Sequence, residues 1–153
     1  AAFAHTSTPR VWTDGFIVPL EGKISGAFGK QRIINGQKKN PHTGEDISAP
    51  QGAKVKASNR GIIRMATEQF FGGKSILIDH GLGLFTMYFH LSKMLVKKGE
   101  TVDRGTVIGL VGSSGRATGP HLHWGARLNN ARVDPYELIR IKTGSRLNSV
   151  RSQ

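Results

Sequence analysis

Short apolar runs separated by glycine are the feature that most restricts the fold of this chain. The runs RGIIRMA (60–66), KSILID (74–79), LFTMYFHL (84–91) and TVIGLVG (106–112) have the length of β-strands. Glycine makes up 20 of the 153 residues and stands between these runs, where turns are expected. The Gly72-Gly73 pair between the first two runs predicts a hairpin. We therefore expect a mainly antiparallel β domain.

One short helix is expected near the end of this domain. Asp134 can act as its N-cap, and Pro135 suits the first helical position. Glu137 completes a capping-box pattern ahead of the apolar Leu138 and Ile139. The predicted fold class is thus mainly β: a compact antiparallel β-sheet or sandwich domain with one short C-terminal helix.

The chain length of 153 residues predicts a single domain with its own core. Residues 1–15 are polar and read as a leader or linker, residues 16–140 as the domain, and residues 141–153 as a basic flexible tail. Because no run of about 18 apolar residues occurs, we expect no transmembrane segment. We expect a monomer.

The charge is strongly positive, with 22 Lys and Arg against 10 Asp and Glu, a formal net charge of +12. Such a chain is attracted to polyanions, either nucleic acid or an anionic cell envelope. The basic residues are dispersed, and neither a helix-turn-helix pattern nor an RNP-like aromatic motif is present. No nucleic-acid partner is therefore expected. The absence of cysteine excludes disulfides, a thiolate nucleophile and a cysteine-based zinc site.

The run HLHWGARL (121–128) places two histidines on one face of a strand. Side chains alternate along a strand, so residues two apart lie on the same side. The apolar set that claims the core is Leu122, Trp124, Ala126 and Leu128. His121 and His123 are therefore expected to leave the core together, on the opposite face.

A third histidine falls in the alternating run LFTMYFHL (84–91). The face expected to join the core consists of Phe85, Met87 and Phe89. The face expected to point to solvent or a cleft consists of Thr86, Tyr88 and His90. A further histidine, His80 in IDHG, is expected to have a structural role at a strand end.

The segment PHTGEDI (41–47) adds His42 and, four residues later, Asp46. Gly44 and Pro41 disfavour a helix here, and in an extended segment residues four apart share a face. An imidazole nitrogen and a carboxylate oxygen together suit Zn²⁺.

In total, four imidazoles and one carboxylate are available. A catalytic zinc uses three protein ligands, so two histidines would remain as a general base and an oxyanion donor. The spacing does not decide which of His121 and His123 binds the metal.

The motifs HTGED (42–46), YFHLS (88–92) and GPHLHW (119–124) together resemble the signature of the lysostaphin/LytM-type zinc endopeptidases. The resemblance extends from about residue 16 to residue 138. It implies a groove that holds one Zn²⁺ ion, with His42, Asp46 and His123 as ligands. It also implies that His90 and His121 are the catalytic pair that acts on a metal-activated water.

The same resemblance implies hydrolysis of peptide cross-links in bacterial peptidoglycan, in the periplasm or outside the cell. Members of the family cut either D,D cross-links or glycine bridges, and the forms HTGEDI and TGPHLHWGARLNN are similar to those of Gram-negative envelope enzymes, which favours D,D-endopeptidase activity on peptide stems. Attraction to an anionic cell envelope would fit the positive charge.

Two alternatives remain open besides a basic nucleic-acid binder. A catalytically silent member of the same fold could bind and activate other wall hydrolases. The segment VKKGETVDRGTVIGLVG (96–112) also resembles a biotinyl or lipoyl carrier, although the Met-Lys pair typical of carriers is absent.

Overall fold

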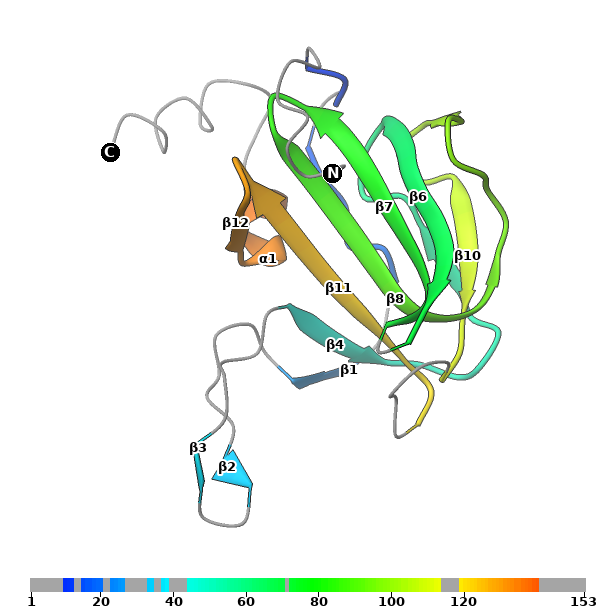
Figure 1. The fold of residues 1–153 in the computed structure, drawn as a ribbon, viewed down its shortest axis with the longest axis vertical. Helices are drawn as coiled ribbons and strands as arrows, with labels where there is room; N and C mark the ends of the chain where they lie inside the picture. The colour runs from blue at the N-terminus through cyan, green and yellow to red at the C-terminus, as the bar shows by residue number, and fades with distance from the viewer. Residues whose placement is uncertain are drawn as a thin grey trace.

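The structure is a computed structural model that describes residues 10–12, 15–20, 23–26, 33–34, 37–38, 44–70, 72–113 and 119–140. His42 and the expected tail, 141–153, lie outside the described residues. The strands are β1 (Lys23–Gly26), β2 (Ile33–Ile34), β3 (Gln37–Lys38), β4 (Glu45–Ser48), β5 (Lys54–Lys56), β6 (Gly61–Gln69), β7 (Gly73–Gly81), β8 (Leu84–Met94), β9 (Thr101–Val102), β10 (Val107–Val111), β11 (His121–Leu128) and β12 (Ala131–Val133). The helix α1 spans Pro135–Arg140 (Figure 1).

One large sheet contains most of these strands, in the order β1-β4-β11-β8-β7-β6-β9. β12 extends it beside β11, and β10 pairs with both β8 and β5. The pairings of the central strands β11, β8, β7 and β6 are all antiparallel. The predicted fold class, a mainly antiparallel β domain with one short helix, is confirmed.

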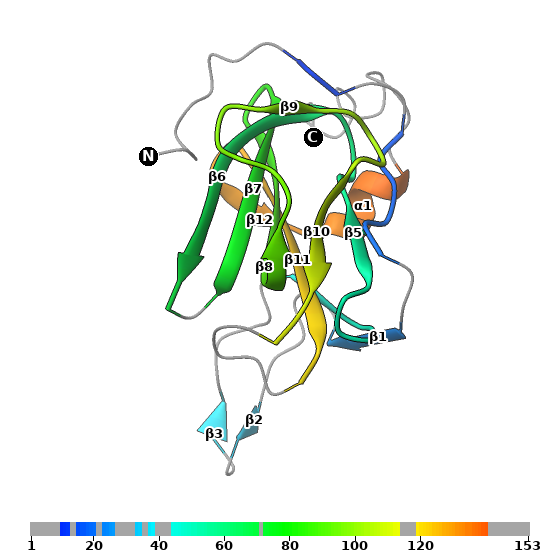
Figure 2. The same cartoon turned by 90° about the vertical axis from the view of Figure 1, so that its right-hand side faces the viewer.

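The main core lies on one face of the central strands. Figure 2 shows β5, β10 and α1 to one side of the layer formed by β6, β7, β8 and β11. The largest fully buried side chains of this core include Ile47, Ile63, Ile76, Tyr88, Leu91, Ile108, Leu122 and Trp124. The opposite face of β6, β7, β8 and β11 is left for a pocket described below.

Two tight turns fix the register of neighbouring strands. Leu82 and Gly83 connect β7 to β8 with φ values of 52° and 80°, and Asn129 and Asn130 connect β11 to β12 with φ values of 50° and 68°. Positive φ at both central residues is the mark of two-residue hairpins, whose twist matches that of the strands. The predicted hairpin between β6 and β7 is also present.

The helix begins as the sequence predicts. The backbone N–H of Tyr136 donates to Oδ1 of Asp134 at 3.0 Å, which is an N-cap hydrogen bond. Leu138 of α1 packs in a second buried cluster with Trp12 and Phe16. Trp12, within the segment expected to be a leader, is thus packed against the domain; the boundary at residue 15 stays a prediction.

Strand β8 corrects one expectation about faces. Phe85 and Met87 are buried as predicted, in a small cluster with Leu77. Thr86 and Tyr88, expected to face solvent or a cleft, are fully buried on the main-core side instead. The expectation was wrong because the face of β8 that carries Thr86 and Tyr88 packs on the main core, where their hydroxyls lie 2.7 Å apart and that of Tyr88 accepts from the N–H of Ser58 at 3.1 Å.

In the part of the chain that the structure describes, no helix is both long enough and apolar enough to cross a membrane.

Candidate metal and catalytic site

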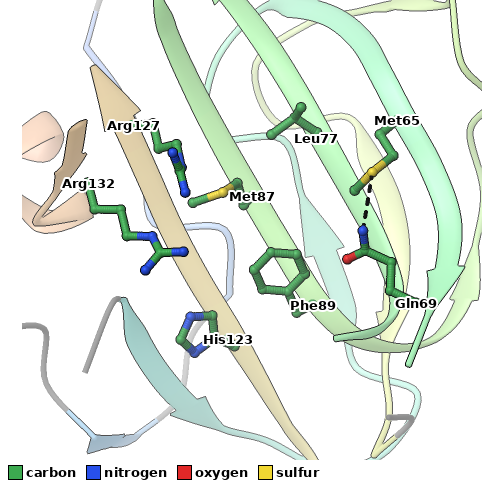
Figure 3. Close-up of a pocket in the computed structure, with 8 residues that line it drawn as sticks. All are labelled: Met65, Gln69, Leu77, Met87, Phe89, His123, Arg127 and Arg132. Atoms are coloured by element: carbon green, nitrogen blue, oxygen red, sulfur yellow. Dashed lines mark hydrogen bonds between the residues drawn. The ribbon is translucent and has the colours of Figure 1, made fainter. Parts of the chain in front are cut away.

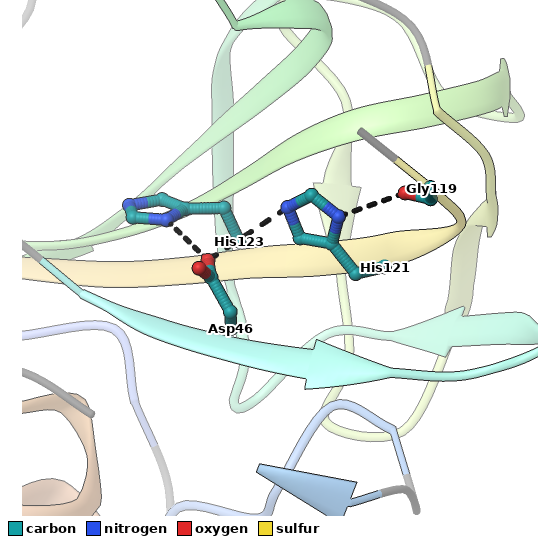
Figure 4. A network of polar contacts seen from close by, with 4 residues as sticks. All are labelled: Asp46, Gly119, His121 and His123. Carbon is teal, nitrogen blue, oxygen red and sulfur yellow. Dashed lines mark hydrogen bonds and ion pairs between the residues drawn. The ribbon is translucent and has the colours of Figure 1, made fainter. Parts of the chain in front are cut away.

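The site is built on the pairing of β4 with β11. In this antiparallel register His123 lies directly opposite Asp46, although the two residues are 77 positions apart in the chain. Directly opposed residues point to the same face of a sheet and their side chains touch. Nδ1 of His123 and Oδ1 of Asp46 are 2.8 Å apart (Figure 4), and the two side chains are 14% and 19% exposed. Their apolar neighbours Leu122 and Ile47 turn into the core.

His121 lies two residues before His123 and shares its face, as predicted. Its Nε2 is 3.8 Å from Oδ1 of Asp46, and its Nδ1 is 2.9 Å from the carbonyl oxygen of Gly119. A carbonyl oxygen only accepts hydrogen bonds, so Nδ1 of His121 must carry the proton. In the neutral ring Nε2 is then the unprotonated nitrogen, and Figure 4 shows that it faces Asp46.

His90 reaches the same place through an irregularity of β8. Tyr88 pairs with Ile76 of β7 and Leu91 with Lys74, so three steps along β8 match two along β7. This is a β-bulge, which reverses the alternation of side chains beyond it. Tyr88 and Leu91 consequently both join the main core. His90, which lies between these two residues, therefore does not place its side chain in the main core.

The bulge also places the His90 ring among the other imidazoles. Its ring centroid is 4.9 Å from that of His121 and 6.3 Å from that of His123. His90 has a φ of 66°, in the left-handed region that non-glycine residues rarely adopt. Such strained backbone is found preferentially at functional sites.

Two glycines allow the strands to approach closely enough for this arrangement. A Cβ atom at Gly44 would lie 2.6 Å from the carbonyl oxygen of Trp124 and 2.8 Å from Nε2 of His123. A Cβ atom at Gly112 would lie 2.5 Å from the backbone nitrogen of Ser92. Sequence reasoning did not single out either role, although Gly44 lies inside the HTGED motif. The N–H of Gly112 also donates to the carbonyl oxygen of His90 at 3.1 Å, which ties the segment after β10 to β8 beside the site.

The residues that the structure describes fit a metal ion in part. Oδ1 of Asp46 and Nδ1 of His123 lie 2.8 Å apart, and zinc sites combine these two donor types. Within the described ranges, no group of three or more His, Asp or Glu side chains stands ready to hold a metal. His42, the expected third ligand, lies outside those ranges. The structure therefore brings together Asp46, His90, His121 and His123.

A pocket extends from this site along the face of the sheet opposite the main core (Figure 3). It is lined by Met65, Gln69, Leu77, Met87, Phe89, His123, Arg127 and Arg132. The ring of Phe89 stacks on that of His123, with centroids 5.5 Å apart and planes 27° from parallel. The pocket and the imidazole cluster therefore share His123.

Clustered histidines and a carboxylate beside a pocket are the kinds of side chain that a metal-dependent hydrolase uses. Residues 40–135 match the family model described as Peptidase family M23. This match covers more than half of the chain, so the chain belongs to that peptidase family. The resemblance stated from the sequence motifs is thereby confirmed.

Three known proteins illustrate the relationship. The chain is 43% identical over 109 residues to the peptidoglycan DD-endopeptidase ShyA of Vibrio cholerae, an alignment that covers 69% of this chain and 25% of ShyA. A crystal structure of a zinc-containing peptidase from Vibrio cholerae superposes with a TM-score of 0.73 at 35% identity, covering 78% of this chain and 38% of that one. The catalytic domain of lysostaphin from Staphylococcus simulans gives a TM-score of 0.69 at 33% identity, covering 78% of this chain and 93% of that domain. The chain thus spans about a quarter of the length of ShyA.

Proposed function

We propose that this protein is a zinc-dependent endopeptidase that hydrolyses peptide cross-links of bacterial peptidoglycan, outside the cytoplasm, with D,D specificity. The observation that carries the proposal is the cluster formed by Asp46, His123, His121 and His90 in a chain of the M23 family. The name of ShyA, a DD-endopeptidase, supports the choice of peptidoglycan and of the D,D cross-link.

Three residues would hold the metal in this proposal: His42, Asp46 and His123. The 2.8 Å approach of Asp46 to His123 supports the inclusion of these two. When bound, Zn²⁺ would supply a Lewis acid and would lower the pKa of the attacking water toward neutrality. The ring of Phe89 stacks on the His123 imidazole, and glycine at position 44 leaves room for this ring, since a Cβ atom there would lie 2.8 Å from its Nε2.

His121 is suited to accept a proton. Its Nδ1–H is engaged by the Gly119 carbonyl, so the lone pair of Nε2 is directed into the site. A positioned general base of this kind contributes about 10²–10⁴-fold to a hydrolytic rate.

His90, whose ring lies beside that of His121, is the second imidazole of the pair. We assign to it a hydrogen bond to the substrate carbonyl oxygen as negative charge develops there.

The decisive experiment uses a purified muropeptide dimer with a single D,D cross-link and mass spectrometry of the released fragments. The zinc-loaded protein should produce monomers, and His123→Ala and Asp46→Asn should lower the rate at least about a hundredfold. Asp103→Asn, a change of the same type at an exposed carboxylate paired with Arg60, is the control and should retain full activity.

Three results would contradict the proposal. Full activity of His123→Ala would exclude the proposed site, and cleavage of glycine bridges alone would exclude D,D specificity. A protein that binds wall material and stimulates a second hydrolase, but cuts no dimer when loaded with zinc, would be the silent regulatory module instead.

A further inference from the structure

The pocket that starts at His123 contains two arginines whose positions the proposed hydrolysis does not explain. Arg127 lies four residues after His123 on β11, so strand alternation puts it on the same face. Arg132 of β12 is directly opposite Arg127 in the β11–β12 register. Figure 3 shows both guanidinium groups beside His123 and Met87, with Met65 and Gln69 across the pocket.

Two like charges directly opposite on neighbouring strands are unfavourable. The pKa of Arg127 is lowered, first because the guanidinium is partly removed from water and second because Arg132 is close. Nη1 of Arg127 donates to Oδ1 of Asn130 at 3.3 Å, a neutral acceptor that orients the guanidinium. The two residues therefore concentrate positive charge at one end of the pocket, where an anionic ligand would relieve their repulsion.

The remainder of the pocket has a different character. Its wall is formed by apolar side chains, namely Met65, Leu77, Met87 and Phe89. None of the described residues that line it is acidic. A pocket with an apolar wall and a basic end suits a ligand that combines an aliphatic chain with a carboxylate, because arginine binds carboxylates through paired hydrogen bonds.

We infer that Arg127 and Arg132 form a subsite for a free carboxylate of the peptidoglycan stem, about two or three residues away from the scissile bond. The inference rests on the proposed function for the identity of the ligand. A strand rises about 3.4 Å per residue, so the backbone of Arg127 lies about 14 Å from that of His123. Long arginine side chains shorten this separation, which places the carboxylate within about two or three residues of the bond cleaved.

Three carboxylates of a stem could occupy the subsite: the α-carboxylate of the γ-linked D-Glu, the side-chain carboxylate of diaminopimelate and the carboxylate at the C-terminus. The probe is the uncross-linked stem peptide L-Ala-γ-D-Glu-meso-diaminopimelate-D-Ala. It is prepared as the free acid and as three amides, each with one of these three carboxyls amidated. Binding to the full chain is measured by calorimetry, and cleavage of the matching dimers is measured separately.

We expect one of the three amidated peptides to bind at least about tenfold more weakly than the free acid, as the loss of a charge-assisted hydrogen bond predicts. The amide that weakens binding identifies which carboxylate is recognised. The variants Arg132→Gln and Arg127→Gln/Arg132→Gln should weaken binding of the free acid by a similar factor. They should not change the affinity for the amide that already binds weakly. Arg132 is exposed, so the single variant keeps the test valid if the double variant fails to fold.

The matched control is Lys97→Gln/Lys98→Gln, which removes the same charge from an exposed loop outside the pocket. Equal weakening by the control and the arginine variant, or equal binding of all four peptides, would overturn the inference. Arginine-dependent binding without cleavage of any dimer would support the subsite and contradict the proposed hydrolysis. Cleavage of all the dimers at the same rate, whichever carboxyl is amidated, would support the proposed hydrolysis and contradict the subsite.

Discussion

His80 allows a quantitative prediction about the pH dependence of stability. The side chain is fully buried in β7. Its Nδ1 lies 2.8 Å from the carbonyl oxygen of Arg60, and its Nε2 lies 2.7 Å from Oγ1 of Thr86. Thr86 in turn lies 2.7 Å from the hydroxyl of Tyr88. Because the carbonyl requires a donor, Nδ1 carries the proton, and the neutral ring accepts at Nε2.

Burial lowers the pKa of His80 from 6.5 to about 4, against the smaller opposing effects of the Arg60 carbonyl and Asp79. Between pH 6.5 and about pH 4, His80 is therefore protonated in the unfolded chain and neutral in the folded chain. The stability linked to this group is fully present above pH 6.5 and is lost as the pH falls to about 4. At about 1.4 kcal/mol per pKa unit the loss is about 3 kcal/mol, a large part of the 5–15 kcal/mol typical of a domain.

The assay is urea unfolding of the wild type and of His80→Gln at intervals from pH 7.5 to pH 4, with chelator present so that metal binding does not contribute. Other titrating groups cancel in the difference between the two proteins. This difference should shrink by about 3 kcal/mol toward pH 4. A difference that stays constant over this range would refute the reasoning. If His80→Gln does not fold, NMR titration of the wild-type ring provides the test, since a His80 ring that titrates near pH 6.5 would refute it equally.

Two further predictions concern the backbone at His90 and the net charge. His90→Gly should be about 1 kcal/mol more stable than His90→Ala in urea unfolding, because a Cβ atom is unfavourable at a φ of 66°. Both variants should lose hydrolysis of the dimer. Equal stabilities of the two variants would show that the left-handed conformation is unstrained. We also propose that the net charge of +12 holds the protein on the anionic envelope, so binding to isolated wall material should fall as NaCl is raised from about 0.1 M to 1 M. Binding that is unchanged by salt would exclude this attraction.

Much of the site could be predicted because strand alternation is a strong local rule. In β11 the apolar positions Leu122 and Trp124 are fully buried, and His121 and His123 lie on the opposite face as expected. The start of α1 was equally predictable from the sequence, since an N-cap residue such as Asp134 forms its hydrogen bond with a residue only two positions away. The pairing of Asp46 with His123 is non-local, and only the family resemblance connected the two.

The position of His90 shows where the local rule fails. Simple alternation assigns His90 to the same face as Tyr88, which the structure buries in the main core. His90 reaches the other imidazoles only because a bulge inserts one residue between Tyr88 and Leu91. The sequence YFHLS carries no glycine to mark this bulge, and the strain is carried by His90 itself. A bulge of this type is fixed by its neighbours, since the N–H of His90 donates to the carbonyl of Gly72 at 2.7 Å.

The arginine pair depends on a turn rather than on a motif. Asn129 and Asn130 form a two-residue turn, so Leu128 pairs with Ala131 and Arg127 with Arg132. One residue more in this turn would shift the register by one position and send the Arg132 side chain to the other face of the sheet. The asparagines tolerate the positive φ that the turn requires, and they thereby place the second guanidinium in the pocket. The turn therefore determines that both guanidinium groups lie at the same end of the pocket.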